Sequence, residues 1–421
     1  MTGLILAAPS SGAGKTTVTL AALRALSRKG MAVRGAKSGP DYIDPRFHEA
    51  ACGQPCPNLD AWAMSPDRLR ALAAGDGLLL IEGAMGLFDG APPDGRGAVA
   101  DLARLLCLPV VLVVDAGRMA QSVAPLVAGF ANHDPEVCIA GILLNNVGST
   151  RHDAMLRRAL EPLGIPVLGT LPRDPSLAMP SRHLGLVQAG ERPDLDAFLD
   201  RAADWIEAGC DLDTLTALAA PLPGTPGMRR VPPPGQRIAV ARDAAFAFAY
   251  PHLLDDWRAQ GAELTFFSPL ADDPVPAADL VYLPGGYPEL HAGRLAANTR
   301  FLDSLRSAAA TTPVHGECGG YMVLGQGLTD ADGTRHVMAG LLELETSFAT
   351  RRLHLGYRHL TALGGPFSGR LTAHEFHYAT TLAAWGDPLY AATDAEGAAL
   401  PPMGLRSGQV TGSFAHVIDR A

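Results

Sequence analysis

The stretch LILAAPSSGAGKTTVTLAALRALSRKG, residues 4–30, joins an apolar run to a glycine-rich loop and then to a helical pattern. A loop of this kind between a strand and a helix presents backbone amides and a helix N-terminus to a phosphate. The Lys15 side chain can reach the outer phosphates of a nucleotide, and the Thr16 hydroxyl can ligate Mg²⁺. Pro9 stands where the usual pattern has its first glycine. The residues predicted to bind the nucleotide are Ser11, Gly12, Gly14, Lys15, Thr16 and Thr17.

Apolar runs alternate with helical patterns on both sides of this loop. The runs LLLIEG (78–83), VVLVVDA (110–116) and GILLNNV (141–147) are continuous and rich in leucine and β-branched residues. Such runs, separated by helices, are typical of a parallel sheet that is covered on both faces. RIAVARD, ELTFFSP, LVYLPGG and PVHGE repeat the pattern in the second half. The sequence therefore predicts an α/β protein with two mostly parallel sheets.

The stretch PLPGTPGMRRVPPPG, residues 221–235, separates the two halves. Its prolines and glycines exclude a helix or a central strand. A chain of 421 residues is also longer than one core usually organises. We predict a first domain at 1–220, a linker at 221–235 and a second domain at 236–421.

Composition argues against several partners. Hydrophobic residues make up 48% of the chain and charged residues 18%, as in ordinary globular proteins. With 34 basic and 43 acidic residues the formal charge is −9, and no basic tract favours nucleic acid or an anionic membrane. The chain has no signal-peptide pattern and no membrane-spanning run, so we expect it in the cytoplasm. Six scattered cysteines then indicate free thiols, and Cys52, Cys56 and His48 lack a fourth ligand for zinc.

Carboxylates at strand ends and in neighbouring loops are candidate metal ligands. Glu82 ends LLLIEG, and GPDYIDP carries Asp41 and Asp44. Mg²⁺ prefers hard oxygen ligands, so we predict a metal site of Thr16, Asp44 and Glu82. Asp115 ends another apolar run and is a weaker candidate, and Asn145 and Asn146 fit either base binding or strand capping.

The loops at this sheet edge are also expected to bind the substrate. We predict that Asp41, Tyr42 and Asp89 do so. The alternative for the aspartates, including Asp44, is turn formation, for which Asp is well suited.

A second candidate site lies in PVHGECGGYMV, residues 313–323. Cys318 stands between a predicted strand and a predicted helix, on the kind of sharp turn that holds a nucleophile. We expect this turn to expose the sulfur and favour the thiolate. Backbone amides of Gly286 and Gly319 are predicted to form the oxyanion site, and His416 is the predicted base. The alternative is a buried structural thiol.

These motifs together resemble the cobyrinic or hydrogenobyrinic acid a,c-diamide synthase family over nearly the whole chain. The motifs are SGAGKTT, GPDYIDP, EGAMGLFDG, YLPGGYPEL, GECGGYM, LHLGYR, HEFHY and GSFAHV. The first half is similar to dethiobiotin synthetase and its P-loop relatives, and the second to a flavodoxin-like class I glutamine amidotransferase. Many class I amidotransferases carry His-x-Glu, but Ile418 stands two residues after His416 and Asp419 is off-register. HEFHY does not have the H-E-x-x-H spacing of zinc proteases.

The resemblance implies ATP- and glutamine-dependent amidation of the a and c acetate carboxylates of a corrin acid, through acyl phosphates, in cobalamin biosynthesis. It implies Mg²⁺ and ATP at the first domain, and corrin acid, glutamine and ATP as partners. The presence of cobalt in the corrin and the oligomeric state, a homodimer among the options, stay open. A rival function is a nucleotide switch of the partitioning ATPase type with a thiol-hydrolase domain, which leaves the cysteine turn unexplained. A thiol peptidase leaves GPDYIDP and EGAMGLFDG unexplained.

Overall fold

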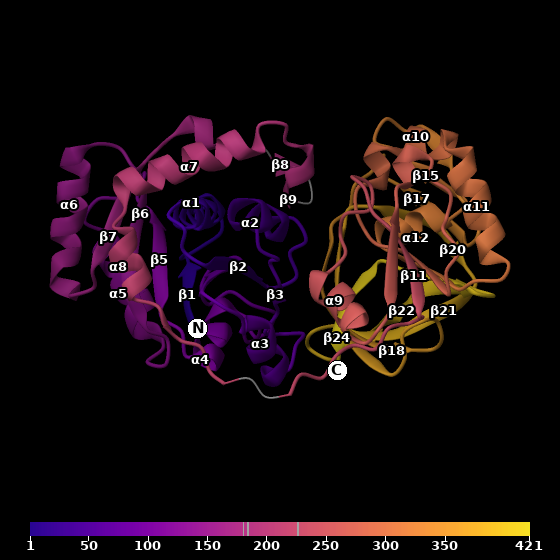
Figure 1. Cartoon of the computed structure of the whole chain (residues 1–421), viewed down its shortest axis with the longest axis horizontal. Helices are drawn as coiled ribbons and strands as arrows, with labels where there is room; N and C mark the ends of the chain where they lie inside the picture. The colour runs from indigo at the N-terminus through magenta and orange to yellow at the C-terminus, as the bar shows by residue number, and fades with distance from the viewer. Residues whose placement is uncertain (180, 183–184, 225–226) are drawn as a thin grey trace. The chain divides into compact units, whose positions relative to one another are not determined.

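The structure is a computed structural model that describes residues 1–179, 181–182, 185–224 and 227–421. The chain divides into two compact units (Figure 1). The first comprises Met1–Arg182 and Leu186–Arg229, and the second comprises Arg230–Ala421. This division falls within residues 221–235. The exact domain bounds 1–220 and 236–421 stay a prediction.

The first unit is built on a parallel sheet of strand order β3-β2-β4-β1-β5-β6-β7. β10 pairs with β1 in the antiparallel direction. Residues Leu4 to Ala7 of β1 are all buried, as expected for a central strand with helices on both faces. The strands are β1 (Thr2–Ala7), β2 (Val33–Ser38), β3 (Asn58–Leu59), β4 (Leu78–Glu82), β5 (Val110–Asp115), β6 (Ile139–Val147), β7 (Val167–Pro172) and β10 (Ala220–Pro221).

Eight α-helices lie in the described part of this unit. α1 packs against α7 and α2, and Arg24 on α1 donates to Asp200 on α7 at 2.8 Å. The helices are α1 (Lys15–Arg28), α2 (Asp44–Cys52), α3 (Pro66–Ala73), α4 (Val99–Leu106), α5 (Val123–His133), α6 (Thr150–Leu160), α7 (Leu195–Gly209) and α8 (Leu212–Ala217). Short elements complete the unit: β8 (Ser181–Arg182), β9 (Gly185–Leu186) and the 3-10 turns η1 (Glu161–Leu163), η2 (Pro175–Leu177) and η3 (Ala189–Glu191).

The second unit contains a ten-stranded mixed sheet of order β12-β11-β13-β14-β23-β22-β21-β18-β19-β24. Neighbours from β12 to β23 are parallel, and those from β23 to β24 are antiparallel. The parallel strands are β11 (Arg237–Ala241), β12 (Glu263–Phe267), β13 (Leu280–Leu283), β14 (Val314–Glu317) and β23 (Val410–Ser413). The others are β18 (His354–Ala362), β19 (Arg370–His377), β21 (Asp387–Thr393), β22 (Ala399–Ser407) and β24 (Ala415–Arg420).

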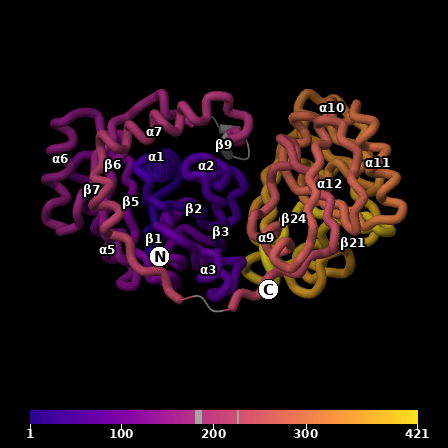
Figure 2. The backbone as a smooth tube through the Cα atoms, viewed as in Figure 1, coloured from indigo at the N-terminus to yellow at the C-terminus, as the bar shows by residue number. Residues whose placement is uncertain are grey.

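A smaller sheet and four α-helices complete the described part of the second unit. The sheet has the order β16-β15-β17-β20. Its strands are β15 (Gly327–Thr329), β16 (Arg335–Val337), β17 (Glu343–Ser347) and β20 (Thr380–Trp385). The helices are α9 (Pro251–Ala259), α10 (Ala292–Ala297), α11 (Thr299–Ala309) and α12 (Gly319–Leu324), with the 3-10 turns η4 (Pro269–Ala271) and η5 (Pro288–Leu290). The tube in Figure 2 follows the chain through both units.

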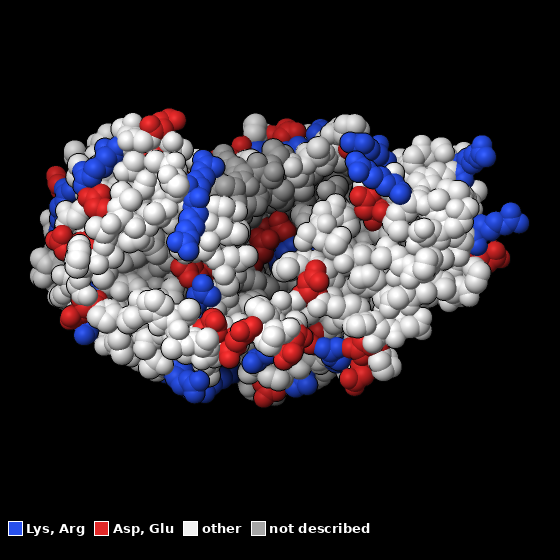
Figure 3. Space-filling view, turned by 180° about the vertical axis from the view of Figure 1, so that it is seen from behind, with Lys and Arg blue, Asp and Glu red and all other residues white. Residues whose placement is uncertain are grey.

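The α/β class with two domains is confirmed. The antiparallel half of the second sheet is an addition that the apolar runs do not indicate, because strands such as HLGYRHLTA and RLTAHEFH mix polar with apolar residues. The charge distribution agrees with the weak case for nucleic acid. Figure 3 shows basic and acidic side chains interspersed, and the described residues on that face form no broad basic area. Within the described ranges, no helix combines the length and apolar character needed to cross a bilayer.

Close packing of α12 on β13 depends on Gly320. A Cβ built on this residue would lie 1.9 Å from the Leu283 carbonyl oxygen, a backbone atom that has little freedom to move. We expect Gly320→Ala to lower the unfolding free energy by more than about 2 kcal/mol, because overpacking forces the helix away from the strand. The midpoint of urea unfolding, followed by tryptophan fluorescence, checks this.

Gly293→Ala is the matched control. Gly293 is exposed in α10, and its nearest atom would be His336 Cε1 at 3.4 Å, an ordinary contact. Alanine has the higher helix propensity, so the midpoint should stay or rise. Equal midpoints for the two variants would show that the close backbone contact at Gly320 does not limit the stability of the protein.

Candidate active sites

The glycine-rich loop of the first unit links β1 to α1. Gly12 and Gly14 have φ values of 82° and 88°, a region that favours glycine. Gly14 is the N-cap of α1, and within the described residues no side chain caps that helix. Its first amides are therefore available to an anion, and the helix dipole favours negative charge there.

The Lys15 side chain lies against the loop. Its ammonium donates to the Ser10 carbonyl at 3.2 Å and to the Met85 carbonyl at 2.5 Å. Burial lowers the pKa of Lys15 to about 8, although the Glu82 carboxylate opposes the shift. A phosphate at the loop would give the Lys15 ammonium a negative charge to pair with, whereas the two carbonyl oxygens carry only partial negative charge. Ser11 is exposed, and Thr16 and Thr17 are half-buried in the first turn of α1.

Thr16, Asp44 and Glu82 come together beside this loop. The Thr16 hydroxyl donates to Glu82 Oε1 at 2.6 Å and lies 3.4 Å from Asp44 Oδ2. Glu82 is fully buried at the end of β4, and Asp44 is 7% exposed at the start of α2. A hydroxyl and two carboxylates in mutual contact are hard oxygen ligands that fit Mg²⁺. These residues would hold the ion, and the ion would supply positive charge beside the phosphates.

Two residues of this cluster, Lys37 and His48, were not predicted from the sequence to belong to it. The Lys37 ammonium lies 2.5 Å from Asp44 Oδ2 and 2.7 Å from Glu82 Oε1. His48 Nε2 lies 2.6 Å from Glu82 Oε2. Lys37 stands near the end of a strand run, VRGAKS, and a lysine at that place in a buried strand is the signal that could have found it.

Lys37 and Glu82 stabilise each other's charge, whereas burial and the neighbouring Asp41 carboxylate raise the pKa of Asp44. Burial disfavours the charge on Lys37, but Asp44 and Glu82 outweigh that effect and hold its pKa above the usual range. Burial likewise opposes the charge on Glu82, but Lys37 and His48 hold its pKa below the usual range. The carboxylates therefore require a cation, which Lys37 provides in this structure.

His48 and the two nearby cysteines have a different arrangement from a zinc site. His48 Nδ1 lies 3.2 Å from Cys56 Sγ while its Nε2 contacts Glu82. The Cys52 thiol donates to the His48 carbonyl. Burial raises the pKa of Cys56, so its sulfur is a neutral thiol. The trio orients the Glu82 carboxylate.

The predicted substrate residues have local structural roles. Asp41 Oδ1 accepts from the amides of Ile43 and Asp44 at the start of α2, and Asp89 Oδ2 accepts from the Gly86 amide. Tyr42, which lies between Asp41 and Ile43 in the sequence, is half-buried. Turn formation thus explains both aspartates, and their role in substrate binding stays a prediction.

The polar residues at the ends of β5 and β6 also make local contacts. Asn145 donates to the Ala13 carbonyl at 2.9 Å and so supports the phosphate loop. Asn146 donates to Asp115, which also accepts from the Gly117 amide. The structure shows strand capping by Asp115 and Asn146.

Cys318 occupies a strained turn between β14 and α12. Its φ of 46° and ψ of −100° lie in a region that non-glycine residues rarely adopt, at a cost of about 1–3 kcal/mol. A Cβ on Gly316 would lie 2.6 Å from the Gly320 carbonyl carbon, so the strand and helix meet too closely for a side chain. The Cys318 amide donates to the Ser413 carbonyl at 2.8 Å. This is the geometry of a nucleophile elbow.

The predicted base and oxyanion residues converge on this turn. A Cβ on Gly285 would lie 2.2 Å from His416 Cε1 and 3.3 Å from Cys318 Cβ. The same construction on Gly319 reaches within 2.9 Å of the Gly286 amide nitrogen. The structure therefore brings His416, Gly286 and Gly319 together at Cys318. Their catalytic roles stay a prediction.

The resting protonation state differs from the expected thiolate. The Cys318 side chain is buried, with 2% of its surface exposed. Burial, followed by the Glu289 and Glu375 carboxylates, raises its pKa above the usual range. Burial lowers the pKa of His416 to about 4, with Glu317 opposing the shift. A neutral thiol beside a neutral imidazole is the resting pair, and proton transfer must accompany attack on a substrate.

Glu317 is a further group that the sequence analysis overlooked. Its Oε2 lies 3.8 Å from His416 Nδ1, and its side chain is 1% exposed. Its position directly before Cys318 in GECGG is the sequence feature that could have pointed to it. Ile418, two residues after His416, is fully buried and offers no acid.

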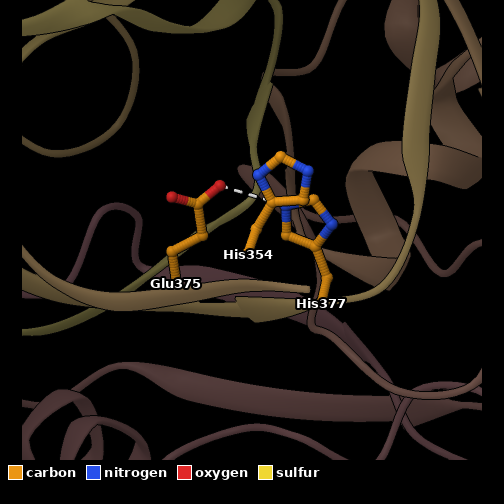
Figure 4. Close-up of side chains that lie close together, drawn as sticks. All are labelled: His354, Glu375 and His377. Atoms are coloured by element: carbon orange, nitrogen blue, oxygen red, sulfur yellow. Dashed lines mark hydrogen bonds and ion pairs between the residues drawn. The ribbon is translucent and has the colours of Figure 1, made fainter. Parts of the chain in front are cut away.

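The motif HEFHY contributes to a polar cluster in the same unit. Figure 4 shows His354, Glu375 and His377, whose candidate ligand atoms lie within 4.8 Å of one another. The two imidazole rings are stacked at 4.6 Å and nearly parallel, so their in-plane lone pairs do not point at one ion. Arg358 donates twice to Glu375 Oε2. The arrangement is that of a hydrogen-bonded network.

Comparisons with known proteins agree with this pair of sites. The model described as "CobQ/CobB/MinD/ParA nucleotide binding domain" matches residues 4–187, and "CobB/CobQ-like glutamine amidotransferase domain" matches residues 237–420. Relatives named "Hydrogenobyrinate a,c-diamide synthase" come from Brucella anthropi, Rhizobium meliloti and Rhodobacter capsulatus. In that order they are 58%, 56% and 54% identical to this chain. The matched regions span 100%, 100% and 99% of this chain and 99%, 99% and 98% of the relatives. This chain belongs to the hydrogenobyrinate a,c-diamide synthase family.

Membership confirms the enzyme class expected from the resemblance. The chain is an amide-forming ligase of cobalamin biosynthesis, with a nucleotide-binding domain and a glutamine amidotransferase domain. A solved structure titled "Crystal structure of glutamine amidotransferase" is 17% identical and covers 38% of this chain and 80% of its own. Its TM-score to this chain is 0.27.

The Lys37 ion pairs lead to a prediction about stability. Lys37→Met leaves two buried carboxylates without their cation, which should lower the unfolding free energy at pH 7 by about 3 kcal/mol. In the wild type, the lowered pKa of Glu82 gives stability that is lost on acidification. In the variant the buried carboxylates lack their cation and bind protons more tightly in the folded state than in the unfolded state, so protonation stabilises the variant. The difference in unfolding free energy between wild type and variant should therefore be smaller at pH 5 than at pH 7. Urea unfolding at both pH values measures it.

Mg²⁺ should restore part of the lost stability if the oxygen ligands bind it, because an ion that binds only the folded state stabilises it. Lys29→Met is the control, since Lys29 is exposed at the end of α1. An equal effect of the two substitutions at pH 7 would contradict the charge-compensating role of Lys37.

Proposed function

We propose that this chain amidates the a and c acetate carboxylates of hydrogenobyrinate, using ATP and glutamine and passing through acyl phosphates. The observation that carries the proposal is the presence, on one chain, of a phosphate loop with an acidic cluster and a cysteine elbow with a histidine. The names of the relatives support a corrin without cobalt as the substrate.

The two sites supply the two halves of one reaction. A carboxylate does not form an amide in water without activation, so the first unit transfers the γ-phosphoryl group of ATP to the substrate carboxylate. The Cys318 thiolate attacks the glutamine side-chain amide, and ammonia leaves as the thioester forms. Ammonia then attacks the acyl phosphate and expels phosphate, and water hydrolyses the thioester to release glutamate.

Each predicted residue has a part in this scheme. Ser11, Gly12, Gly14 and Thr17 line the phosphates together with Lys15, and Mg²⁺ is held by Thr16, Asp44 and Glu82. Lys37 provides positive charge at the same place. Asp41, Tyr42 and Asp89 contact the corrin. In the second unit, His416 moves the proton, and the amides of Gly286 and Gly319 stabilise the oxyanion.

Cys318→Ala tests the glutamine half. Glutamine-dependent synthesis should fall by at least about 10³-fold, because no other group replaces the nucleophile. Synthesis from concentrated ammonium chloride should persist, since free ammonia bypasses the missing step. Steady-state rates with both nitrogen sources, on hydrogenobyrinate and ATP, measure this.

Cys210→Ala is the matched control, because Cys210 is another buried thiol, 8% exposed, in the first unit. It should keep both activities. Retained glutamine use by a folded Cys318→Ala protein would contradict the proposed nucleophile.

Lys15→Ala tests the activation half. Removing the ammonium from the phosphate loop should reduce amide formation by about 10²-fold or more with glutamine and with ammonia alike, because both require the acyl phosphate. Lys29→Ala, at an exposed lysine, should leave both rates unchanged. Ammonia-dependent synthesis at the wild-type rate in Lys15→Ala would remove phosphoryl transfer at this loop from the scheme.

A further inference from the structure

We propose that Glu317 positions His416 and stabilises its protonated form, taking the place of the glutamate that many class I amidotransferases carry two residues after the histidine. This inference rests on the proposed glutaminase function of Cys318 and His416. It assigns a role to the residue directly before the nucleophile.

The geometry places one carboxylate oxygen at the distal nitrogen of the imidazole. Glu317 Oε2 lies 3.8 Å from His416 Nδ1, and both side chains are 1% exposed. A movement of roughly 1 Å closes this distance to a hydrogen bond. Such a bond would add to the hydrogen bond between the imidazole and the Phe248 backbone, which also favours the protonated ring.

Neighbouring groups hold the carboxylate in this position. The Tyr282 hydroxyl donates to Oε2 at 2.7 Å, and the Val417 amide donates to Oε1 at 3.2 Å. His315 Nε2 is 3.9 Å from Oε1, and His315 Nδ1 is 2.9 Å from the Thr411 hydroxyl. Because Val417 is the residue after His416, the carboxylate is tied to the strand that carries the histidine.

A buried imidazolium needs a negative charge nearby. When His416 takes the thiol proton, its positive charge forms in a site from which water is excluded. Glu317 and Glu375 favour that charge, whereas His377 opposes it. His374, the cross-strand partner of His416, is also buried, and burial lowers its pKa to about 3, so its ring is neutral and adds no positive charge beside the imidazolium.

The usual acid position is occupied by an apolar side chain. Ile418 stands two residues after His416, at a register shift between β24 and β19 that pairs Val417 with Ala373 and Asp419 with Thr372. Ile418 is fully buried there. The buried carboxylate beside His416 therefore comes from Glu317 at the end of β14, the strand that leads to Cys318, and not from β24, which carries the histidine.

Glu317→Gln tests the inference, since glutamine keeps the shape, can accept from the Val417 amide through its carbonyl oxygen, and can donate to the Tyr282 hydroxyl through its NH2 group. We expect kcat/KM for glutamine hydrolysis to fall by about 10²-fold or more. The acidic limb of its pH profile should move to lower pH, because His416 acts as the base only when neutral and its imidazolium loses its counter-charge. Synthesis from ammonia should stay at the wild-type rate. Glu317→Gln with Ile418→Glu, which restores the usual position, should recover part of the loss and return the limb toward higher pH.

Asp256→Asn is the control for loss of a buried carboxylate. Asp256 is 1% exposed in the same unit and accepts from the Val231 amide. This variant should lower the melting temperature without moving the pH profile. If Glu317→Gln does not fold at the assay temperature, the profile of Glu317→Asp decides, with a limb at lower pH than in the wild type as the supporting result.

Two outcomes separate this inference from the proposed function. Wild-type kcat/KM and an unmoved acidic limb in folded Glu317→Gln, while Cys318→Ala is inactive with glutamine, would overturn the role of Glu317 alone. Glutamine hydrolysis by Cys318→Ala would overturn the proposed function instead.

Discussion

The backbone at Cys318 depends on the absence of side chains around it. Glycines at 316, 319 and 320 let β14 turn into α12 while the helix touches β13 through backbone atoms. Gly285 leaves room for the histidine ring beside the cysteine. Steric exclusion thus holds a residue in a rarely adopted conformation, and the same close packing brings the amides of Gly286 and Gly319 together. Rigid surroundings of this kind place reacting groups without loss of entropy at each turnover.

Electrostatics organises the first unit in a comparable way. Asp44 and Glu82 are removed from water, and a buried carboxylate is stable only with a cation and hydrogen-bond donors. Lys37, His48 and the Thr16 hydroxyl supply these in the structure. A divalent ion entering between the same oxygens would take over part of this charge compensation. The site therefore has a cationic side chain beside the phosphate loop whether or not an ion is bound.

Much of this architecture can be predicted from the sequence because local patterns determine it. Continuous apolar runs predict buried parallel strands, and the phosphate loop and the elbow are each contained in a few consecutive residues. Lys37 and Glu317 were missed because their partners are distant in sequence: 45 residues separate Lys37 from Glu82, and 99 separate Glu317 from His416. The protonation state of Cys318 was missed for another reason. A helix N-terminus favours thiolate, but burial outweighs it, and burial depends on the whole fold.

The neutral, enclosed state of Cys318 has a consequence for chemical durability. Peroxides and alkylating agents attack the thiolate, and they attack it fastest where it is accessible. The sulfur of Cys318 is 2% exposed and protonated at rest, whereas Cys107 and Cys138 are exposed on the first unit. Oxidants in the cell would meet these two thiols first. Cys318 is thus protected from oxidation by the same enclosure that makes its thiol a weak acid.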